Sequence, residues 1–446
     1  MRARAASVLR TLIVEQKHLV VSGVSSFIIR IGGLVSAFLL GVVLARALGP
    51  ADYGIYGLVI SLSAMAMNIA LLGTPQLAVR EMAVRSAKSD WDGCRSLANR
   101  FLTATIGSSI LLGAIALAAA YLVAGHDPKI IEASWLGVLI TIAVGIGALA
   151  AAELRGLGRL EKGQFMDILG RPATALLITA LIASGSPLNA ATALEIQLAV
   201  TIAATAISLV WLRHAMPVAI TAPRPAGWRW LKAALPLGFV DILKQFDGTY
   251  GIILVGLFAS ARDLGIYRVA LSSTVIANMP VTILHVVLAP TVSRLFRFGD
   301  REELQQLLRT ASGVMCASIA PMIIVLLLFG QALVGAIFGA AYANAWLPLA
   351  LLCGAQLALG IFGMGPVLLA MADSERHLAR IYASAVVTGV AVAALLIPRL
   401  GMTGAALAQL ISTAIIGIRS HRFARRHLGL GTTFLSRPTP QRTEAQ

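Results

Sequence analysis

Long apolar stretches recur along the whole chain, and short polar segments separate them. A helix of about 20 apolar residues is long enough to cross the roughly 30 Å hydrocarbon layer of a bilayer. The pattern predicts twelve such helices, at about residues 21–45, 53–73, 102–124, 131–152, 166–184, 192–212, 236–258, 266–289, 311–329, 345–370, 380–397 and 402–419. We therefore expect an all-α integral membrane protein.

Lysine and arginine alternate between the two ends of these predicted helices. With the N-terminus inside, the outside segments hold only Arg46, Lys129, Arg262 and Arg399, and the inside segments hold about seven times as many basic residues. Cytoplasmic loops of membrane proteins carry this excess. The pattern predicts that both termini are cytoplasmic. It also accounts for the net charge of +16 without a nucleic-acid partner.

The two halves of the chain repeat a short motif. Asp52-x-Gly54-Ile55-Tyr56 follows the first predicted helix, and Asp263-x-Gly265-Ile266-Tyr267 follows the seventh. A basic segment with a predicted helix cap comes after each, at Ser89-x-x-Asp92 and Asp300-x-x-Glu303. The repeat predicts two six-helix lobes in parallel orientation, because six crossings return the chain to the same side.

These patterns divide the chain into five parts: a cytoplasmic lead-in (1–20), an N-lobe (21–212), a cytoplasmic linker (213–235), a C-lobe (236–425) and a disordered cytoplasmic tail (426–446). Duplicated lobes with a site between them near the middle of the membrane are typical of alternating-access transporters. We expect a central cavity between the lobes.

Charged residues inside the predicted membrane helices are the main functional signal, because each is costly in lipid and must face protein or water. The seventh helix carries Asp241, Lys244 and Asp247 within an arc of about 120°. We interpret the cations as a pocket for an anionic substrate group, with Arg30, Lys244 and Arg268 as its members. The alternative is internal ion pairing of Lys244 with its neighbouring carboxylates, or a lipid-interface position for Arg268.

The remaining polar positions in the predicted helices have weaker interpretations. Asp241 and Asp247 are candidates for charge balance or for binding a coupling H⁺ or Na⁺. Gln245 and Asn278 could contact sugar hydroxyls or bond neighbouring helices. We expect Asp167 and Arg171 to pair with each other one helical turn apart. We predict that the aromatic residues near helix ends are anchors at the membrane interface: Tyr53, Tyr56, Trp135, Trp211, Tyr267, Tyr342 and Trp346.

Catalytic and metal-binding motifs are missing from the sequence. It has no phosphate-binding G-x-x-x-x-G-K-[ST] loop and no H-E-x-x-H pair, and its three cysteines have no metal-ligand spacing. The predicted outside loops are short, which disfavours a membrane glycan polymerase or ligase. We expect neither an enzyme nor a cofactor.

Three features of the sequence resemble the polysaccharide-transport family of oligosaccharide flippases. They are the segment from Leu44 to Tyr56 with its Gly-Pro-x-x-Tyr-Gly element, the 6+6 pattern, and the basic segment after the second helix. That family belongs to the multidrug/oligosaccharidyl-lipid/polysaccharide exporter superfamily. The resemblance covers about residues 20–425.

The resemblance implies a V-shaped protein of the bacterial inner membrane that moves undecaprenyl-diphosphate-linked sugar repeats to the outer leaflet for O-antigen, capsule or exopolysaccharide synthesis. Its implied partners are the lipid-linked glycan, the bilayer, a polysaccharide polymerase and a chain-length regulator. Arginines on the first, second and eighth helices face the cavity in lipid-linked-precursor flippases. Arg30 and Arg268 lie on the first and eighth helices here, and the second helix holds no arginine. A cation-coupled multidrug exporter of the same superfamily is the alternative function.

Overall fold

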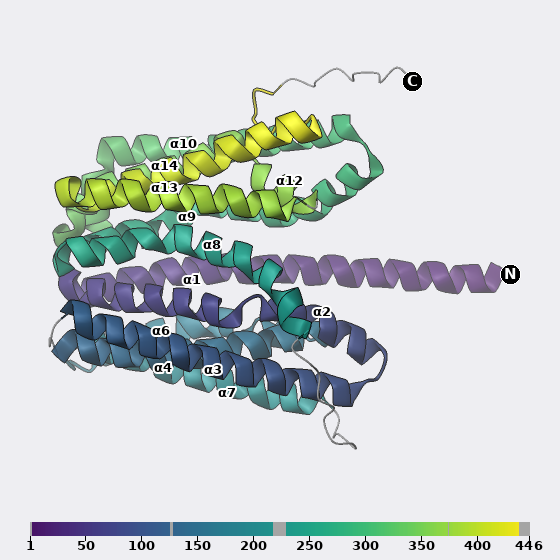
Figure 1. The fold of residues 1–446 in the computed structure, drawn as a ribbon, viewed down its shortest axis with the longest axis horizontal. Coiled ribbons are helices and arrows are strands. Elements are labelled where there is room, and N and C mark those ends of the chain that lie inside the picture. The colour runs from purple at the N-terminus through teal and green to yellow at the C-terminus, as the bar shows by residue number, and fades with distance from the viewer. Residues whose placement is uncertain (1, 125–127, 217–228, 373, 437–446) are drawn as a thin grey trace.

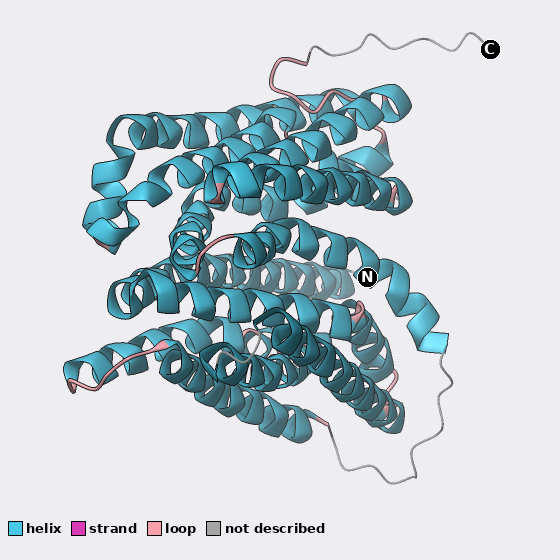
Figure 2. Cartoon of the chain, turned by 60° about the vertical axis from the view of Figure 1, so that its left-hand side comes forward, coloured by secondary structure: helices cyan, strands magenta, loops and turns pink. Residues whose placement is uncertain are grey.

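The computed structural model describes residues 2–124, 128–216, 229–372 and 374–436, and within them every regular element is helical (Figure 2). The elements in order are α1 (Arg2–Leu71), α2 (Thr74–Ala87), α3 (Trp91–Ala124), α4 (Pro128–Gly156), α5 (Leu160–Gly163), α6 (Phe165–Ala183), α7 (Ala190–Ala215), α8 (Arg229–Phe258), α9 (Ala261–Phe298), α10 (Arg301–Phe338), η1 (Ala340–Ala345), α11 (Trp346–Phe362), α12 (Gly365–Met371), α13 (Glu375–Leu400), α14 (Met402–Phe423) and η2 (Ala424–Leu428).

Helix α1 contains the first two predicted membrane helices, joined by a sharp reversal at Gly49. The backbone of Gly49 has φ 71° and ψ 172°, which is outside the helical region and is easily adopted only by glycine. Pro50 follows and lacks the amide that a continuous helix would need. The two halves of α1 therefore run side by side in opposite directions (Figure 1).

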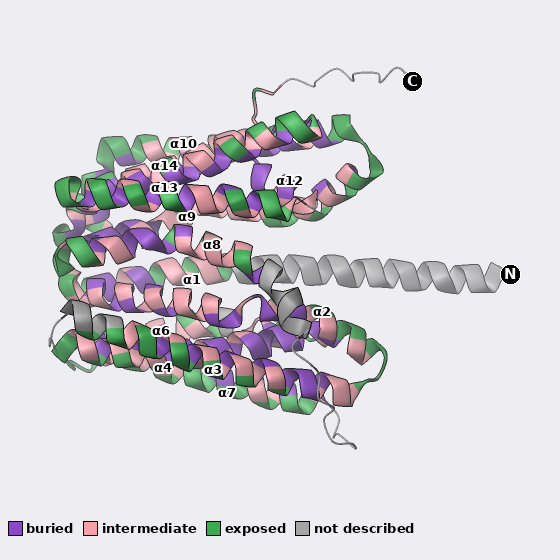
Figure 3. Cartoon of the chain, in the orientation of Figure 1, coloured by how far each residue is buried: buried purple, intermediate pink, exposed green. Residues whose placement is uncertain are grey.

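Each of the twelve predicted membrane helices corresponds to a helix or half-helix of the structure. The tenth is broken between α11 and α12, where Gly363 adopts φ 65°. Nine segments of the described chain are long and apolar enough to span a membrane by length and composition alone. Large apolar side chains such as Leu176, Leu328 and Leu395 are about 70% exposed on outer helices (Figure 3). The structure confirms the all-α membrane fold.

The helices form two bundles with α1 and α8 between them (Figure 1). Helices α3, α4, α6 and α7 pack on one side of α1, and α9, α10, α11, α13 and α14 make up most of the other bundle. One cluster of buried side chains crosses from α1 to α8, α9 and α11, and it includes the fully buried Tyr53, Tyr250, Tyr267 and Tyr342. Each bundle has a further apolar core of its own.

The two ends of the molecule differ in charge. We call the end with α2, α5, α12 and η2 the basic end, because it gathers most of the arginines and lysines of the described chain. We call the end with the reversals at Gly49, Gly185, Gly339 and Gly401 the opposite end.

Residues 429–436, which we call the C-terminal strap, fold back onto the second bundle at the basic end. The side-chain amide of Gln305 accepts from the Gly431 amide at 2.7 Å and donates to the Gly431 carbonyl at 2.6 Å. Arg309 donates to the Phe434 carbonyl at 2.9 Å. The strap thus ties the segment after α14 to α10. In the first bundle, Arg95 likewise donates to the carbonyl of Met216, just after α7, at 2.9 Å.

Two local predictions need correction. The cap of α3 is Asp90, whose carboxylate accepts from the Gly93 amide at 3.0 Å, and Ser89 instead has φ 56°. The predicted cap of α10 by Asp300 is confirmed by its bond from the Glu303 amide.

Tyr53, Tyr56, Tyr267 and Tyr342 are not interfacial anchors, since each is at most 4% exposed and lies inside the protein. Trp135, at 52% exposure, has the surface position expected of an anchor.

Candidate functional site

A cavity of about 790 Å³ lies between the two bundles. Its wall comes from both halves of α1, from α4, α6 and α7 of the first bundle, and from α8 and α9 of the second. It extends from Leu44 and Tyr53 to Pro75, Arg155 and Gly163, and therefore runs toward the basic end. This is the central cavity that the duplicated sequence predicts.

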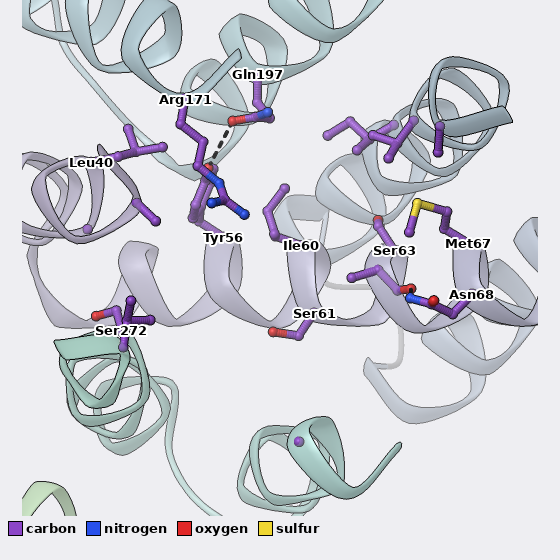
Figure 4. A pocket seen from close by; sticks show the side chains of 18 of the residues that line it. Leu40, Tyr56, Ile60, Ser61, Ser63, Met67, Asn68, Arg171, Gln197 and Ser272 are labelled. Atoms are coloured by element: carbon purple, nitrogen blue, oxygen red, sulfur yellow. Dashed lines mark hydrogen bonds between the residues drawn. The ribbon is translucent and has the colours of Figure 1, made fainter. Parts of the chain in front are cut away.

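The middle of the cavity is organised around Tyr56 on the second half of α1. Its hydroxyl lies 3.4 Å from the side-chain oxygen of Gln197 on α7. The Arg171 side chain from α6 extends beside this pair into the cavity (Figure 4). Arg171 also donates to the backbone carbonyl of Gly33, in the first half of α1, at 3.2 Å. Helices α6 and α1 thus position one guanidinium in the cavity.

The second bundle contributes Arg268 from α9. Its guanidinium donates to the Ser61 hydroxyl of α1 at 3.1 Å, so the bond joins the two bundles. The alkyl part of Arg268 lies against Gly57, and a Cβ added there would come within 2.7 Å of it. The Nε atom of Arg268 is buried without a hydrogen-bond partner. Gly57 therefore makes the space in which this arginine is held, and the guanidinium keeps a free donor.

Arg155 of α4 supplies a third guanidinium near the basic end, where it donates to the Gly163 carbonyl at 3.2 Å. Ser61, Ser63, Asn68 and Gln197 are neutral polar residues of the same wall. Among the described residues that line the cavity, none is acidic. A guanidinium matches phosphate or carboxylate oxygens with paired donors, so the arrangement suits an anion.

Of the predicted anion-pocket residues whose side chains the structure describes, Arg268 lies in this wall and Lys244 does not. Arg30 lies on α1, but its side chain is outside the described part of the structure, as is that of Asp167. Lys244 does not line the cavity. Its ammonium lies 3.9 Å from Asp241, one turn away on α8, and 5.8 Å from the centre of the Tyr382 ring. The ion-pair alternative thus describes Lys244 in this structure.

Asp241 also joins the bundles, because its carboxylate accepts from the Gln76 amide of α2 at 2.6 Å. Asp247 points into the second bundle, where it is 8% exposed. It accepts hydrogen bonds from the Ser412 hydroxyl and, at 3.1 Å, from the Gln409 amide. The two carboxylates of α8 therefore have different surroundings, and neither lines the cavity.

The two amides predicted as sugar contacts also lie away from the cavity wall. Gln245 donates to Thr249 on its own helix at 3.1 Å, and Asn278 is half-buried on α9.

The sequence interpretation missed Arg171, Arg155, Tyr56 and Gln197 as cavity residues. For Arg171 a signal was present, because this arginine lies inside a predicted membrane helix, ahead of its apolar run. It was assigned to a local pair with Asp167 instead.

Comparison with known proteins identifies the family. Residues 22–296, more than half of the chain, match the family model described as "Polysaccharide biosynthesis protein". No curated protein matched the sequence. Among solved structures, a multidrug resistance MATE family transporter of the MOP superfamily in an inward-facing conformation has a TM-score of 0.73 at 14% identity, covering 89% of this chain and 94% of that one.

The lipid II flippase MurJ in an inward closed conformation has a TM-score of 0.70 at 14% identity, covering 91% of this chain and 87% of that one. An outward-facing conformation of a MATE family transporter of the MOP superfamily gives 0.61 at 14% identity, with 90% and 93% covered. These relatives are transporters and a flippase rather than enzymes. The chain belongs to the polysaccharide biosynthesis protein family and has the fold of the MOP superfamily of transporters.

Proposed function

We propose that the protein is a flippase that moves an oligosaccharide linked to undecaprenyl diphosphate across the bacterial inner membrane, for synthesis of O-antigen, capsule or exopolysaccharide. The observation that carries the proposal is the cavity between the bundles, which has Arg155, Arg171 and Arg268 in its wall and no acidic residue among its described lining. The family match supports a glycan as the cargo.

The charge of the cavity suits the part of this cargo that is hardest to move. A diphosphate carries about two negative charges, and transferring bare ions of this kind into hydrocarbon would cost tens of kcal/mol. Arg171 and Arg268 offer paired donors from the two bundles. Ser61, Asn68 and Gln197 place hydroxyl and amide groups in the same wall, where sugar hydroxyls would meet them.

The shape of the cavity and the charge of the two ends support an orientation in the membrane. The bundles meet at the opposite end, while the cavity runs toward the basic end. The greater likeness to the inward-facing than to the outward-facing transporter supports a cytoplasmic position of the basic end. The excess of basic residues supports the same assignment, with both termini cytoplasmic. In this role the protein would work beside a polysaccharide polymerase and a chain-length regulator.

A cation-coupled multidrug exporter of the same superfamily is the competing function. A cavity that holds cationic drugs would need carboxylates, and the described lining has three arginines instead. Asp241 and Asp247 remain our candidates for H⁺ or Na⁺ coupling or charge balance. The burial of Asp247 among Ser412 and Gln409 favours Asp247 of the two.

Binding of the lipid-linked glycan tests the proposal. Purified protein in lipid nanodiscs should bind a polyprenyl-diphosphate oligosaccharide, and the same glycan on an uncharged polyprenyl carrier should bind at least tenfold more weakly. Arg171→Gln and Arg268→Gln should each weaken binding of the diphosphate form. The matched control is Arg297→Gln, which removes an exposed arginine outside the cavity. Equal binding of both carriers, or tight binding of cationic drugs instead, would refute the proposal.

A further inference from the structure

The two bundles are joined at the opposite end by a pair of reciprocal contacts between helix ends. The Arg46 guanidinium, from the first half of α1, donates to the Ile337 carbonyl at 2.7 Å and to the Ala336 carbonyl at 2.6 Å. Both carbonyls belong to the last turn of α10, which ends at Phe338. The last four carbonyls of a helix have no amide partner within it and carry its partial negative charge. Arg46 thus supplies the cap that α10 needs.

The second contact runs in the other direction. Tyr342, in η1 just after α10, donates its hydroxyl to the Ala45 carbonyl of α1 at 2.8 Å. This bond is buried, and the Tyr342 side chain is only 2% exposed. The two contacts are therefore reciprocal. Arg46 donates to carbonyls at the end of α10, and Tyr342, shortly after α10, donates to the carbonyl of Ala45, which precedes Arg46.

Aromatic side chains shelter the Tyr342 bond from water, whereas the two Arg46 bonds lie at an exposed surface. Tyr342 meets Tyr53 edge to face at a ring separation of 6.3 Å. Phe38 and Phe338 form a similar pair at 5.9 Å. A hydrogen bond sheltered from water is costly to break without a replacement, because the freed groups are not at once hydrated.

We propose that Arg46 and Tyr342 form a latch that closes the cavity at the opposite end and sets how often the protein opens there. The bundles cannot separate at this end without losing all three hydrogen bonds of the latch. Among the described side chains at the basic end, one hydrogen bond joins α2 to α8, from Gln76 to Asp241. The latch concerns the conformational cycle and does not depend on which cargo is carried.

Thiol labelling tests the latch. In a chain whose Cys94, Cys316 and Cys353 are replaced by serine, Val275→Cys places one thiol in the cavity wall. A membrane-impermeant maleimide is added from the side of the opposite end, which labelling of Ser186→Cys, an exposed residue there, identifies. Tyr342→Phe should raise the labelling rate of the cavity thiol about fivefold, the shift expected from losing one net hydrogen bond. Arg46→Gln, which loses two bonds, should raise the rate at least as much.

Three comparisons make the result decisive. Tyr342→Phe keeps the buried ring and removes only the donor, so it separates the hydrogen bond from packing. Arg46→Lys keeps a cationic donor for the α10 carbonyls and should restore most of the protection. Arg262→Gln removes another exposed arginine of the same end and should change nothing. Labelling at the parental rate in both latch variants, or an equal rise in Arg262→Gln, would overturn the proposal.

Discussion

Gly54 of α1 lies directly against Gly265 of α9. A Cβ added to Gly54 would come within 2.8 Å of the Gly265 amide nitrogen, and one added to Gly265 would overlap the Pro50 carbonyl. The two glycines hold the same place in the two copies of the Asp-x-Gly-Ile-Tyr motif. The repeated motif therefore packs against itself across the two bundles, close to the latch.

Enlarging this crossing should keep the opposite end from closing. We expect Gly265→Leu to separate α1 and α9, because the contact there is to backbone atoms, which cannot move aside. Glycan export in cells should be lost, and the Val275→Cys thiol should label from the opposite end. Gly107→Leu is the control, since a Cβ at Gly107 meets no atom within 4 Å. Normal export by the Gly265 variant would contradict the tight crossing.

Adding one methyl group at Gly57 should displace Arg268. Its Cβ would lie 2.7 Å from the Cγ and Cδ atoms of that side chain, so the guanidinium must move away from Ser61. We expect Gly57→Ala to reduce export about tenfold while the protein inserts at its normal level. Gly248→Ala also alters the cavity wall but meets nothing within 4 Å, and it should export normally. Equal export by the two variants would show that the position of Arg268 is unimportant.

Lys244 should matter less than Arg171. The Lys244 side chain is 45% exposed and its pair with Asp241 spans 3.9 Å, an interaction worth about 0–1 kcal/mol in such settings. We expect Lys244→Ala to keep most of the export and Arg171→Ala to lose it, in a complementation assay with matched expression. The reverse order would restore Lys244 as a cation of the site, as the sequence pattern suggested.

Asp247→Asn tests ion coupling. Asparagine keeps the size of the buried side chain and an oxygen that can accept from Ser412, so we expect a folded protein. If Asp247 binds the coupling ion, glycan movement in inverted membrane vesicles should no longer respond to an H⁺ or Na⁺ gradient. Asp241→Asn, at the other candidate carboxylate, whose side chain is 42% exposed, should keep the response to the gradient. An unchanged response to both gradients in the Asp247 variant would exclude this role.

The C-terminal strap should stabilise the second bundle. Gln305→Ala removes both bonds to Gly431 and leaves a buried amide and carbonyl unsatisfied, at a cost of about 1–3 kcal/mol for each group. We expect a lower melting temperature in detergent. Gln306→Ala changes the neighbouring exposed glutamine and should melt like the parent protein. Equal melting temperatures would mean that the strap adds no stability.

The fold followed from the sequence because each membrane helix must be apolar along its own length, which is a local property. The reversal at Gly49-Pro50 and the repeated motif were also visible, since glycine and proline mark sharp changes of direction. Which glycines meet across the bundles was not visible, because the partners are far apart in the chain.

Only part of the site could be predicted from the sequence, because residues far apart in the chain meet there. Arg268 was identified because it lies inside a predicted membrane helix. Lys244 carries the same signal, yet it points away from the cavity, and periodicity alone does not say which helix face meets water. Arg171 was assigned to a neighbour in sequence, whereas its position depends on Gly33 and on the packing of three helices. Side-chain direction between distant helices is a tertiary property.

The crossing of Gly54 and Gly265 also bears on how the molecule is made. About 210 residues separate the two glycines, so the first stays without its counterpart while nearly half of the chain is synthesised. Each half nevertheless has an apolar core of its own. Two co-expressed fragments, divided between α7 and α8, should therefore find each other in the bilayer and rebuild a working protein.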